Sequence, residues 1–468
     1  MNKSGWIKLA LALVCILTLL PPSPVVAQGE QPSGPVYVVQ QGDTLWDIAL
    51  RFGVSMDDLK RVNGISDPGL LNVGDRLVIP GIEGIDAFLV TRTIEYGETL
   101  VSLSRRYQVA PGLITRLNHI TSPAELYAGA NLVVPESTSL DEAGARATLR
   151  AGQSLLELAL VHGADPWTLA SRNALSGTWT VAPGDVLRLP GQTVEGPGAL
   201  PEQIAEVEID PLPLVQGKTT VIRVAAQGGL SLAGTLVDRE LNFFPQEDGS
   251  YVALQGVHAM LPPGLYPLTL RGTLADGTPL GFSQQVYIAS GGYIFEDVLS
   301  VDPATLDQAV TQPEDEQWRA LSAPVTTEKL WSGVFQFTSP SVFFDCWPST
   351  FGRRRSYNGS EYKYFHTGLD VCGGVGDDIY APAAGEVVFA GALTVRGNAT
   401  LINHGQGIYT GYFHQSEILV QVGDRVEPGQ LLGRVGATGR VNGPHLHWEI
   451  WAGGVQVDPM DWLEREYP

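Results

Sequence analysis

The sequence predicts a multidomain chain: three small modules of strand–helix–helix–strand (βααβ) order, an all-β middle domain and a C-terminal domain that gathers the histidines. Three observations predict this architecture. Landmark residues recur every 55 residues in the N-terminal part, β-rich runs alternate with turn sequences in the middle, and five of the eight histidines follow residue 365. A chain of 468 residues is also too long for one hydrophobic core, because domains average roughly 150 residues.

Composition excludes two classes of protein. Hydrophobic residues make up 44% of the chain and charged residues 17%, a balance typical of folded domains that argues against global disorder. The formal net charge is −21. We expect no nucleic-acid partner, because a phosphate-binding surface requires a concentration of Lys and Arg. We interpret the acidic excess as a solvated surface.

The N-terminal segment 1–27 has the pattern of a signal peptide. Lys3 and Lys8 precede an apolar run from Leu9 to Leu20, and Val25-Val-Ala27 resembles a cleavage site. The run is shorter than the roughly 20 residues that cross a membrane. We expect residues 1–27 to be removed and the mature protein to be secreted without a membrane anchor; an uncleaved N-terminal anchor is the alternative.

Internal repetition defines the N-terminal half. Residues 36–80, 90–135 and 147–190 carry the same seven landmark positions in one register. The landmarks are Gly42, Gly97 and Gly152; Leu45, Leu100 and Leu155; Leu59, Ile114 and Leu169; Asn63, Asn118 and Asn173; Gly74, Gly129 and Gly184; Leu77, Leu132 and Leu187; and Pro80, Pro135 and Pro190. This regularity predicts three copies of one fold.

The first copy indicates the order of elements. An extended run begins at Tyr37, and Asp43-Thr44 offer capping oxygens to a helix that ends at Gly53. The helix carries its apolar residues on one face. A second short helix ends at Asn63-Gly64, and a closing strand covers Arg76-Leu-Val-Ile79. Each copy is therefore predicted to be a compact βααβ unit.

This copy resembles the LysM family in Tyr37-Val-Val-Gln-Gln-Gly-Asp-Thr-Leu-Trp-Asp-Ile-Ala, Phe52-Gly-Val-Ser and Leu77-Val-Ile-Pro. The resemblance implies binding to glycans that contain N-acetylglucosamine, such as peptidoglycan or chitin. It places the sugar between the first strand-to-helix loop and the loop around residues 65–71. The contact residues that it implies are Gly42, Asp43, Thr44, Gly97, Glu98 and Thr99. The third copy has His162 in place of Phe52, so for this copy a spacer role is the alternative.

Residues 205–290 are predicted to form an immunoglobulin-like β sandwich. The β-rich runs are Val221-Ile-Arg-Val-Ala, Tyr251-Val-Ala-Leu, Gly264-Leu-Tyr-Pro-Leu-Thr-Leu and Gln285-Val-Tyr-Ile, with hairpin signals at Glu247-Asp-Gly-Ser and Ala275-Asp-Gly-Thr. We interpret His258 as a surface or packing residue. Residues 291–340 are expected to be a partly helical acidic connector.

Two C-terminal motifs have the spacing of metal ligands. His366-Thr-Gly-Leu-Asp370 holds an imidazole and a carboxylate around Gly368, which permits a tight backbone path. His445-Leu-His447-Trp-Glu-Ile-Trp alternates with period two and predicts a strand, so that His445 and His447 share one face. The residues expected to face the core are Leu446, Trp448 and Ile450.

Two imidazoles and one carboxylate suit zinc, with the fourth position left for water. Zinc would lower the pKa of that water to about 7 and polarise a substrate carbonyl. The chain has no His-Glu-x-x-His motif. We therefore expect proton transfer to involve histidines that are not ligands, for which His414 and His445 are available.

Residues 345–463 resemble the lysostaphin-type (LytM-like) zinc endopeptidases of bacterial cell walls. Besides the two histidine motifs, the resemblance rests on Ile379-Tyr-Ala-Pro-Ala-Ala-Gly-Glu-Val-Val, Asn403-His-Gly, Tyr412-Phe-His414, Val422-Gly-Asp-Arg-Val-Glu-Pro-Gly-Gln and Gly436-Ala-Thr-Gly. It implies a mostly antiparallel β domain with one zinc ion per chain, bound by His366, Asp370 and His447. It also implies that His414 and His445 form the catalytic pair, in which one orients or deprotonates water and the other stabilises the oxyanion.

Three features around this motif set have competing interpretations. His404 matches a family position that is not a ligand, so we expect a structural role. The run Arg353-Arg-Arg355 either lines the substrate groove, where it meets a peptide carboxylate, or is a solvated loop. Cys346 and Cys372 are predicted to form a disulfide, because both lie near the first motif and export favours oxidation. The alternative makes Cys372 a thiolate zinc ligand.

These features predict a monomeric peptidoglycan hydrolase of the cell wall or periplasm, which cleaves peptide cross-links or stem peptides and is held to the glycan by its repeats. A catalytically silent scaffold that activates a separate wall amidase is one alternative. A glycan-binding adhesin is another, but it leaves the histidine motifs unexplained. The presence of all five metal and catalytic positions favours the enzyme.

Overall fold

The computed structural model describes residues 34–82, 85, 87–122, 125–136, 144–193, 197–226, 230–275, 277–341 and 346–468. The chain divides into two compact units, with the boundary between Val90 and Thr91. The expected signal peptide lies outside the described residues. Among the described residues, no helix combines the length and apolarity that crossing a bilayer requires.

The first unit contains the first βααβ module. Its elements are β1 (Val36–Val38), α2 (Leu45–Phe52), α3 (Met56–Asn63), the short 3-10 helix η1 (Pro68–Leu70) and β2 (Arg76–Val78). β1 pairs antiparallel with β2. α2 begins where the Thr44 side chain accepts the Asp47 N–H, and it ends at Gly53, whose φ is 64°. The order of elements and the helix stop at Gly53 are confirmed for this copy.

The next two copies have the same order of elements. The second copy contains β3 (Phe88–Thr93), α4 (Leu100–Tyr107), α5 (Pro111–Leu117) and β4 (Asn131–Glu136). The third contains β5 (Gly144–Thr148), α6 (Leu155–Val161), α7 (Pro166–Arg172) and β6 (Val186–Thr193), with β5 antiparallel to β6. The 55-residue interval therefore corresponds to a repeated arrangement of strands and helices.

One asparagine in each copy joins the second helix to the closing strand. The Asn173 amide donates to Leu169 O and to Arg188 O, each at 2.9 Å, and its oxygen accepts the Arg188 N–H at 2.8 Å. Asn63 and Asn118 make the same three bonds at their equivalent positions. An asparagine recurs here because its side chain carries both the donor and the acceptor that this junction requires.

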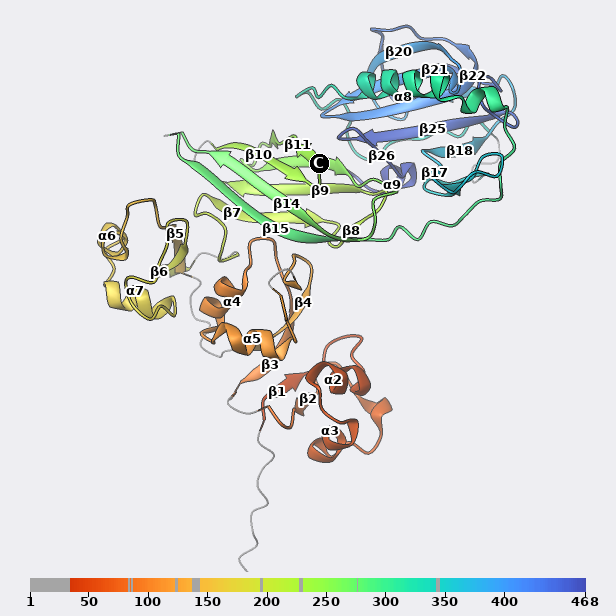
Figure 1. The fold of residues 1–468 in the computed structure, drawn as a ribbon. Coiled ribbons are helices and arrows are strands. Elements are labelled where there is room, and N and C mark those ends of the chain that lie inside the picture. The colour runs from red at the N-terminus through yellow and green to blue at the C-terminus, as the bar shows by residue number, and fades with distance from the viewer. Residues whose placement is uncertain are drawn as a thin grey trace, which may run out of the picture. The chain divides into compact units, whose positions relative to one another are not determined.

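The middle of the second unit is a pair of packed β-sheets. Its strands are β7 (Ile204–Asp210), β8 (Leu214–Val215), β9 (Thr219–Ala226), β10 (Ser231–Leu236), β11 (Arg239–Leu241), β12 (Phe244–Pro245), β13 (Tyr251–Gly256), β14 (Gly264–Thr273) and β15 (Pro279–Ala289). One sheet has the order β11-β10-β14-β15-β8 and the other β12-β13-β9-β7, with a shared apolar core (Figure 1). The four predicted β-rich runs are confirmed as β9, β13, β14 and β15. The immunoglobulin-like assignment remains a prediction.

The C-terminal part is built on one sheet of nine strands, joined by antiparallel pairs. Its strands are β18 (Leu369–Cys372), β19 (Asp378–Tyr380), β20 (Gly385–Leu393), β21 (Gly397–Gly405), β22 (Ile408–Ile418), β23 (Arg425–Val426), β24 (Leu431–Val435), β25 (His445–Ala452) and β26 (Val455–Val457). A two-stranded pair, β16 (Arg354–Arg355) and β17 (Tyr364–Phe365), precedes the sheet, and α9 (Pro459–Glu464) follows it. The prediction of a mostly antiparallel β domain is confirmed.

The two β domains share a hydrophobic core. Val221, Val252 and Leu254 of the sandwich belong to the same buried cluster as Val457 and Trp462. The Lys218 ammonium lies 3.1 Å from an Asp458 carboxylate oxygen at the edge of this contact. The sandwich therefore supports the end of the C-terminal sheet directly.

The segment expected to be an acidic connector contains the 3-10 helix η3 (Pro303–Leu306) and the helix α8 (Gln308–Ser322), which confirms that it is partly helical. Figure 1 shows α8 lying across strands β20, β21 and β22. Trp318 of α8 is fully buried against Leu401, Tyr409 and Phe413. The helix is therefore packed on the C-terminal sheet as part of that domain.

We expect the change Asn173→Ala to weaken the third copy, because the Arg188 N–H and C=O lose their partners while remaining buried. The free energy of unfolding of this copy should fall by about 1–3 kcal/mol. Native-state hydrogen exchange of the β6 amides measures the loss. The exposed neighbour Ser171→Ala is the matched control, and equal exchange rates in the two variants would contradict the role of the asparagine.

Candidate metal centre

Strand pairing brings the two histidine motifs together. β18 runs antiparallel to β25 in a register that sets Asp370 opposite His447 and Cys372 opposite His445. The predicted strand and its alternation are confirmed, since His445 and His447 both approach Asp370 while Leu446 and Trp448 enter the core. The tight path through Gly368 is required, because a Cβ there would lie 2.3 Å from the Trp448 carbonyl oxygen.

Three potential ligand atoms converge at the Asp370 carboxylate. His366 Nε2 lies 3.0 Å and His447 Nδ1 2.8 Å from Asp370 Oδ1, and the two nitrogens are 3.0 Å apart. Atoms that share a tetrahedral zinc ion with bonds of 2.0–2.1 Å lie roughly 3.3 Å apart. Two imidazole nitrogens and one carboxylate oxygen at nearly that spacing fit a zinc ion.

The ring orientations of both candidate ligands are fixed by their other nitrogen. His366 Nδ1 lies 2.9 Å from Thr350 O, so it carries the hydrogen and donates it, and Nε2 keeps its lone pair for the site. His447 Nε2 lies 3.5 Å from a Glu449 carboxylate oxygen, while its Nδ1 faces Asp370. Metal-binding histidines in proteins usually have such a carbonyl or carboxylate behind them.

The charges of the cluster suit a cation. Burial acts to raise the pKa of the Asp370 carboxyl, but His366, His445 and His447 outweigh burial and hold that pKa well below its usual range. Burial lowers the pKa of His366, which keeps that ring neutral. For His447, burial is outweighed by the Asp370 and Glu449 carboxylates, which raise the pKa. A cation bound at Asp370 would displace the proton on His447, as metal binding to histidine generally does.

Two more histidines border these three residues. His445 Nε2 lies 3.4 Å from Asp370 Oδ1, and the His414 ring centroid lies 5.0 Å from that of His445. His414 Nδ1 donates to Thr438 O at 2.8 Å, which leaves Nε2 as the acceptor nitrogen. Burial, together with the charges of His447 and His445, lowers the pKa of His414 to about 3. His414 is therefore neutral near neutral pH and able to accept a hydrogen bond at Nε2.

A second layer of charge surrounds Asp370 on its other side. Arg355 Nη2 lies 3.4 Å from Asp370 Oδ2, and Arg355 Nε donates to Glu296 at 2.8 Å. The Arg354 guanidinium donates to Ala259 O at 2.7 Å. The Arg355 side chain is 15% exposed, which contradicts a solvated loop at this residue, and the groove-lining interpretation of the run remains a prediction.

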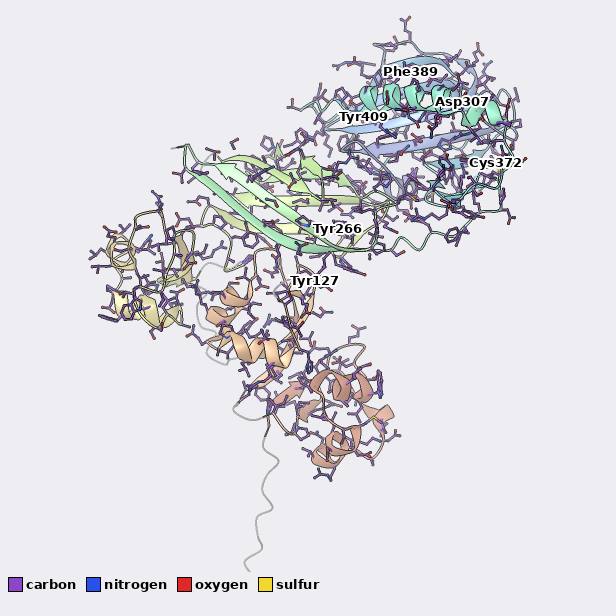
Figure 2. The ribbon with its side chains drawn as sticks, viewed as in Figure 1. Tyr127, Tyr266, Asp307, Cys372, Phe389 and Tyr409 are labelled. Carbon is purple, nitrogen blue, oxygen red and sulfur yellow. A yellow bond between two sulfur atoms is a disulfide. The ribbon has the colours of Figure 1, made fainter. Side chains whose placement is uncertain are left out.

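Cys346 and Cys372 form a disulfide in this structure (Cys372 is labelled in Figure 2). The Cys372 N–H donates to Cys346 O at 3.1 Å, and the Asp370 N–H donates to Ser349 O at 2.9 Å. The segment that begins at Cys346 is thereby held alongside β18. Because the two sulfur atoms are bonded to each other, Cys372 offers no thiolate to a metal.

His404 is a structural residue here, in agreement with the sequence interpretation. Its Nδ1 donates to Ala384 O and its Nε2 accepts from the Thr410 hydroxyl, both at 2.7 Å. This arrangement requires a neutral ring. Burial lowers the pKa of His404 to about 4, and the hydrogen bond to Ala384 opposes the shift only in part.

The glycan-contact residues expected in the first copy have different positions. Gly42 and Thr44 are exposed. The Asp43 side chain is only 7% exposed, and its carboxylate accepts from the Tyr37 hydroxyl at 2.6 Å and pairs with Arg51 at 3.1 Å. The structure contradicts the expected glycan contact of the Asp43 side chain, because that carboxylate is occupied inside the module.

The equivalent loop of the second copy is covered by neighbouring segments. The Gly97 N–H donates to Gln284 Oε1 at 2.7 Å, and Gln284 Nε2 donates to Glu98 O at 2.9 Å. The Leu200 side chain lies so close to Gly97 that a Cβ would meet it at 2.3 Å. This burial contradicts the expected glycan contacts of Gly97 and Glu98. Thr99 caps α4 through the Ser102 N–H, and its contact with glycan remains a prediction.

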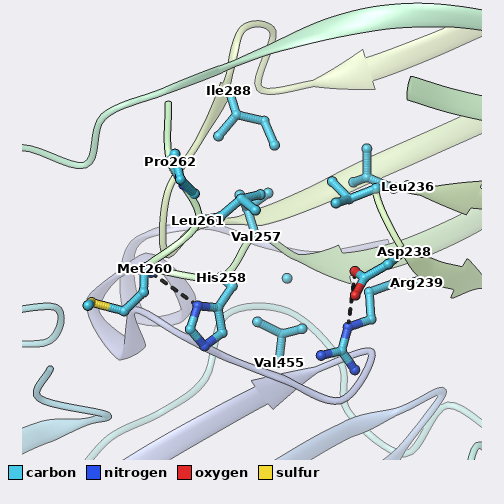
Figure 3. Close-up of a pocket in the computed structure, with 12 residues that line it drawn as sticks. Leu236, Asp238, Arg239, Val257, His258, Met260, Leu261, Pro262, Ile288 and Val455 are labelled. Carbon is cyan, nitrogen blue, oxygen red and sulfur yellow. Dashed lines mark hydrogen bonds and ion pairs between the residues drawn. The ribbon is translucent and has the colours of Figure 1, made fainter. Parts of the chain in front are cut away.

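A cavity of about 330 Å³ lies between the sandwich and Val455 of β26, and its lining contains none of the clustered histidines (Figure 3). Its lining includes Leu236, Val257 and Val455, and Asp238, Arg239 and His258 also border it. The His258 ring packs on Phe365 with 5.3 Å between centroids, and its Nδ1 accepts the Met260 N–H. His258 is exposed and packs on one neighbouring ring, which agrees with the expected surface or packing residue.

Sequence reasoning missed several partners of the candidate ligands. Glu449 could have been predicted from the sequence, because the period-two alternation places this residue on the face of His445 and His447. Thr350 and Thr438 contribute only backbone oxygens, for which the residue type carries no signal. Glu296 belongs to a segment that lies far before Arg355 in the chain, and no local pattern predicts that pairing.

Family models match both ends of the chain. Residues 364–459 match Peptidase family M23, and residues 37–80 and 93–135 match the LysM domain. The chain therefore contains an M23 (LytM-like) peptidase domain that follows LysM domains.

Relatives agree with these domain assignments. The chain is 38% identical over 112 residues to peptidoglycan DD-endopeptidase ShyA of Vibrio cholerae, covering 24% of this chain and 26% of that protein. It is 35% identical over 129 residues to the lipoprotein NlpD/LppB homolog of Pseudomonas aeruginosa, covering 27% and 42%. A structure of the antimicrobial peptidase lysostaphin from Staphylococcus simulans is 32% identical, with coverage of 21% and 44% and a TM-score of 0.21. The chain spans about a quarter of the length of the curated relatives that it matches first.

His404 should make the fold sensitive to acid. Unfolded histidine takes a proton near pH 6.5, whereas folded His404 does so only near pH 4. The contribution of His404 to the free energy of unfolding is therefore fully present above pH 6.5. It decreases as the pH falls toward 4, by at most roughly 3 kcal/mol. Denaturant unfolding at pH 7, 5.5 and 4 measures the trend. His404→Gln should flatten it, and an unchanged slope in that variant would refute the assignment.

Proposed function

We propose that this protein is a zinc endopeptidase that cleaves peptide cross-links or stem peptides of peptidoglycan. One observation carries the proposal: His366 Nε2 and His447 Nδ1 converge on one ionised Asp370 oxygen, with two further histidines beside them. The M23 family match and the DD-endopeptidase relatives support a metallopeptidase that acts on the cell wall. A catalytically silent scaffold that activates a separate amidase is the competing function, and the complete set of five residues argues against it.

The geometry supports separate roles for the three candidate ligands and the two neighbouring histidines. His366, Asp370 and His447 would hold one zinc ion per chain, which would supply Lewis-acid polarisation of the scissile carbonyl and activation of water. His414 keeps a neutral acceptor nitrogen. His445 donates its Nδ1 hydrogen to Gly443 O at 2.9 Å, which directs Nε2 toward the site. Between them, His414 and His445 orient the nucleophile and stabilise the oxyanion.

Glycan binding in this proposal depends mainly on the first copy. Gly42 and Thr44 are exposed at its first loop, and Leu70 and Val73 are exposed in the loop that precedes β2. The third copy, which we propose is also a LysM module, exposes Trp179 in the corresponding loop before β6. The second copy has its first loop covered and serves as a structural link. The mature protein is proposed to act as a monomer in the cell wall or periplasm after removal of residues 1–27.

The proposal predicts which changes separate metal binding from catalysis. Purified protein should carry about one zinc ion per chain and release muropeptides with broken peptide bonds from sacculi, as detected by mass spectrometry. His447→Ala should lose both zinc and cleavage, because it removes a ligand. His445→Ala should keep zinc and lose cleavage at least 100-fold, because it removes a group that acts in the transition state. Full zinc content in His447→Ala would refute the ligand set, and intact sacculi with the zinc-loaded wild type would favour the scaffold.

Deletion of residues 28–85 tests the glycan-binding role and keeps β3 (Phe88–Thr93) of the second copy whole. The truncated protein should sediment less with insoluble peptidoglycan, because a linked binding module is lost. Cleavage of a soluble cross-linked muropeptide should be unchanged, because the second unit retains the metal centre. Leu70→Ala in the full chain tests the exposed loop before β2 alone, whereas a change at Thr44 would also remove the cap of α2. Equal sedimentation of the truncated and full proteins would show that the first copy is a spacer.

A further inference from the structure

Helix α8 lies outside the residues that match the peptidase family, yet it is fixed to the sheet that holds the histidines. Trp318 packs edge-on against Phe389 and Phe413, with ring centroids 5.7 Å and 5.0 Å apart. Phe389 and Tyr409, which line this contact, are labelled in Figure 2. Phe413 in turn stacks on the His447 ring at 5.0 Å. A helix that served only as a linker would have no need of a buried tryptophan at this place.

A buried carboxylate of α8 binds the turn between β20 and β21. Glu314 is 5% exposed, and its Oε2 accepts the Val395 N–H at 2.8 Å. Its Oε1 accepts the Arg396 N–H at 3.0 Å and a hydrogen of the Arg396 guanidinium at 2.9 Å. Asp315 pairs with the same guanidinium at 2.9 Å. The turn is thus held by a charged group from a helix that lies far before it in the chain.

The same turn holds His414. The Arg396 carbonyl accepts the His414 N–H at 3.0 Å. His414 has a φ of 62°, a left-handed conformation that is costly for a residue with a side chain and persists only where neighbouring groups enforce it. The bond to Arg396 O and the ring bond to Thr438 O are two such constraints. A shift of the Val395–Arg396 turn would therefore release the backbone of His414.

We propose that Glu314 is a positioning residue for His414: it fixes the Val395–Arg396 turn, whose carbonyl keeps the His414 ring aimed at the metal centre. The positioning itself rests on geometry alone, and its effect on catalysis rests on the proposed function. In this arrangement α8 is an integral part of the catalytic unit, although it precedes the family-matched residues. A role limited to covering the apolar face of the sheet is the competing explanation, and it requires Trp318 but not Glu314.

The test compares Glu314→Gln with Glu316→Gln in the full chain. Glu316 lies on the same helix, is exposed, and bonds only to Gln312 among the contacts described, so it is a matched control. In Glu314→Gln we expect kcat on a soluble cross-linked muropeptide to fall 10- to 100-fold, with KM and zinc content unchanged, because misplacement of a catalytic group reduces turnover by such factors. Glu316→Gln should match the wild type in all three quantities. An unchanged kcat in Glu314→Gln would overturn the proposal.

An NMR measurement tests the positioning of His414 independently of the proposed enzymatic function. With 13Cε1-labelled histidine, the NMR signal assigned to His414 through His414→Asn should shift in Glu314→Gln, while the signal of His404 stays in place. This outcome does not require enzymatic activity, so a wild type that cleaves nothing would refute the endopeptidase and still leave the positioning testable. An unmoved His414 signal would refute the positioning even if the enzyme is active.

Two further variants exclude a general loss of stability. In a His414→Ala background, adding Glu314→Gln should reduce the residual activity no further, because the two changes act through one group. If Glu314→Gln lowered kcat in the His414→Ala background by the same factor as in the wild type, Glu314 would act through a group other than His414. If Glu314→Gln melts below the assay temperature, Glu314→Asp takes its place. It keeps the charge but is too short to reach both N–H groups, and it should show the same His414 shift.

Discussion

The structure depends on the antiparallel pairing of β18 with β25. This register sets Asp370 opposite His447 and Cys372 opposite His445, and the turn through Gly368 returns His366 to the same place. One carboxylate oxygen thereby lies within 3.4 Å of nitrogen atoms from three histidines. A shift of one residue would move all of these side chains to the opposite face of the sheet, so the chemistry of the site is inseparable from the strand register.

An ionised carboxylate at this depth requires compensation, and the surrounding segments supply it. Arg355 faces Asp370 on the side away from the histidines, and Glu296 balances that guanidinium. Glu449 stands behind His447, and Thr350 O behind His366. Glu296 and Glu314 both precede the residues that match the peptidase family, so contacts around the candidate site also come from the segment between the sandwich and that match.

Sequence patterns predicted the features that depend on local periodicity. The 55-residue interval indicated three βααβ copies, and period-two alternation identified β25 and the common face of His445 and His447. Patterns did not predict partners that meet only after folding. Nothing near Arg355 indicates Glu296. The segment that contains α8 was expected to be an acidic connector, whereas Glu314 is buried on the turn at Arg396. The loop at Gly97 is covered for the same reason, because Gln284 reaches it from β15, a strand that is distant in the sequence.

We propose that two imidazole nitrogens and the Asp370 carboxylate hold a zinc ion. X-ray absorption at the zinc edge of the purified chain tests it most directly. We expect only nitrogen and oxygen atoms bound to the zinc, at about 2.0–2.2 Å, with the signature of two imidazoles. The spectrum should be the same when Cys346 and Cys372 are replaced by serine. A sulfur neighbour at about 2.3 Å, or the absence of bound zinc in protein loaded with the metal, would contradict the account.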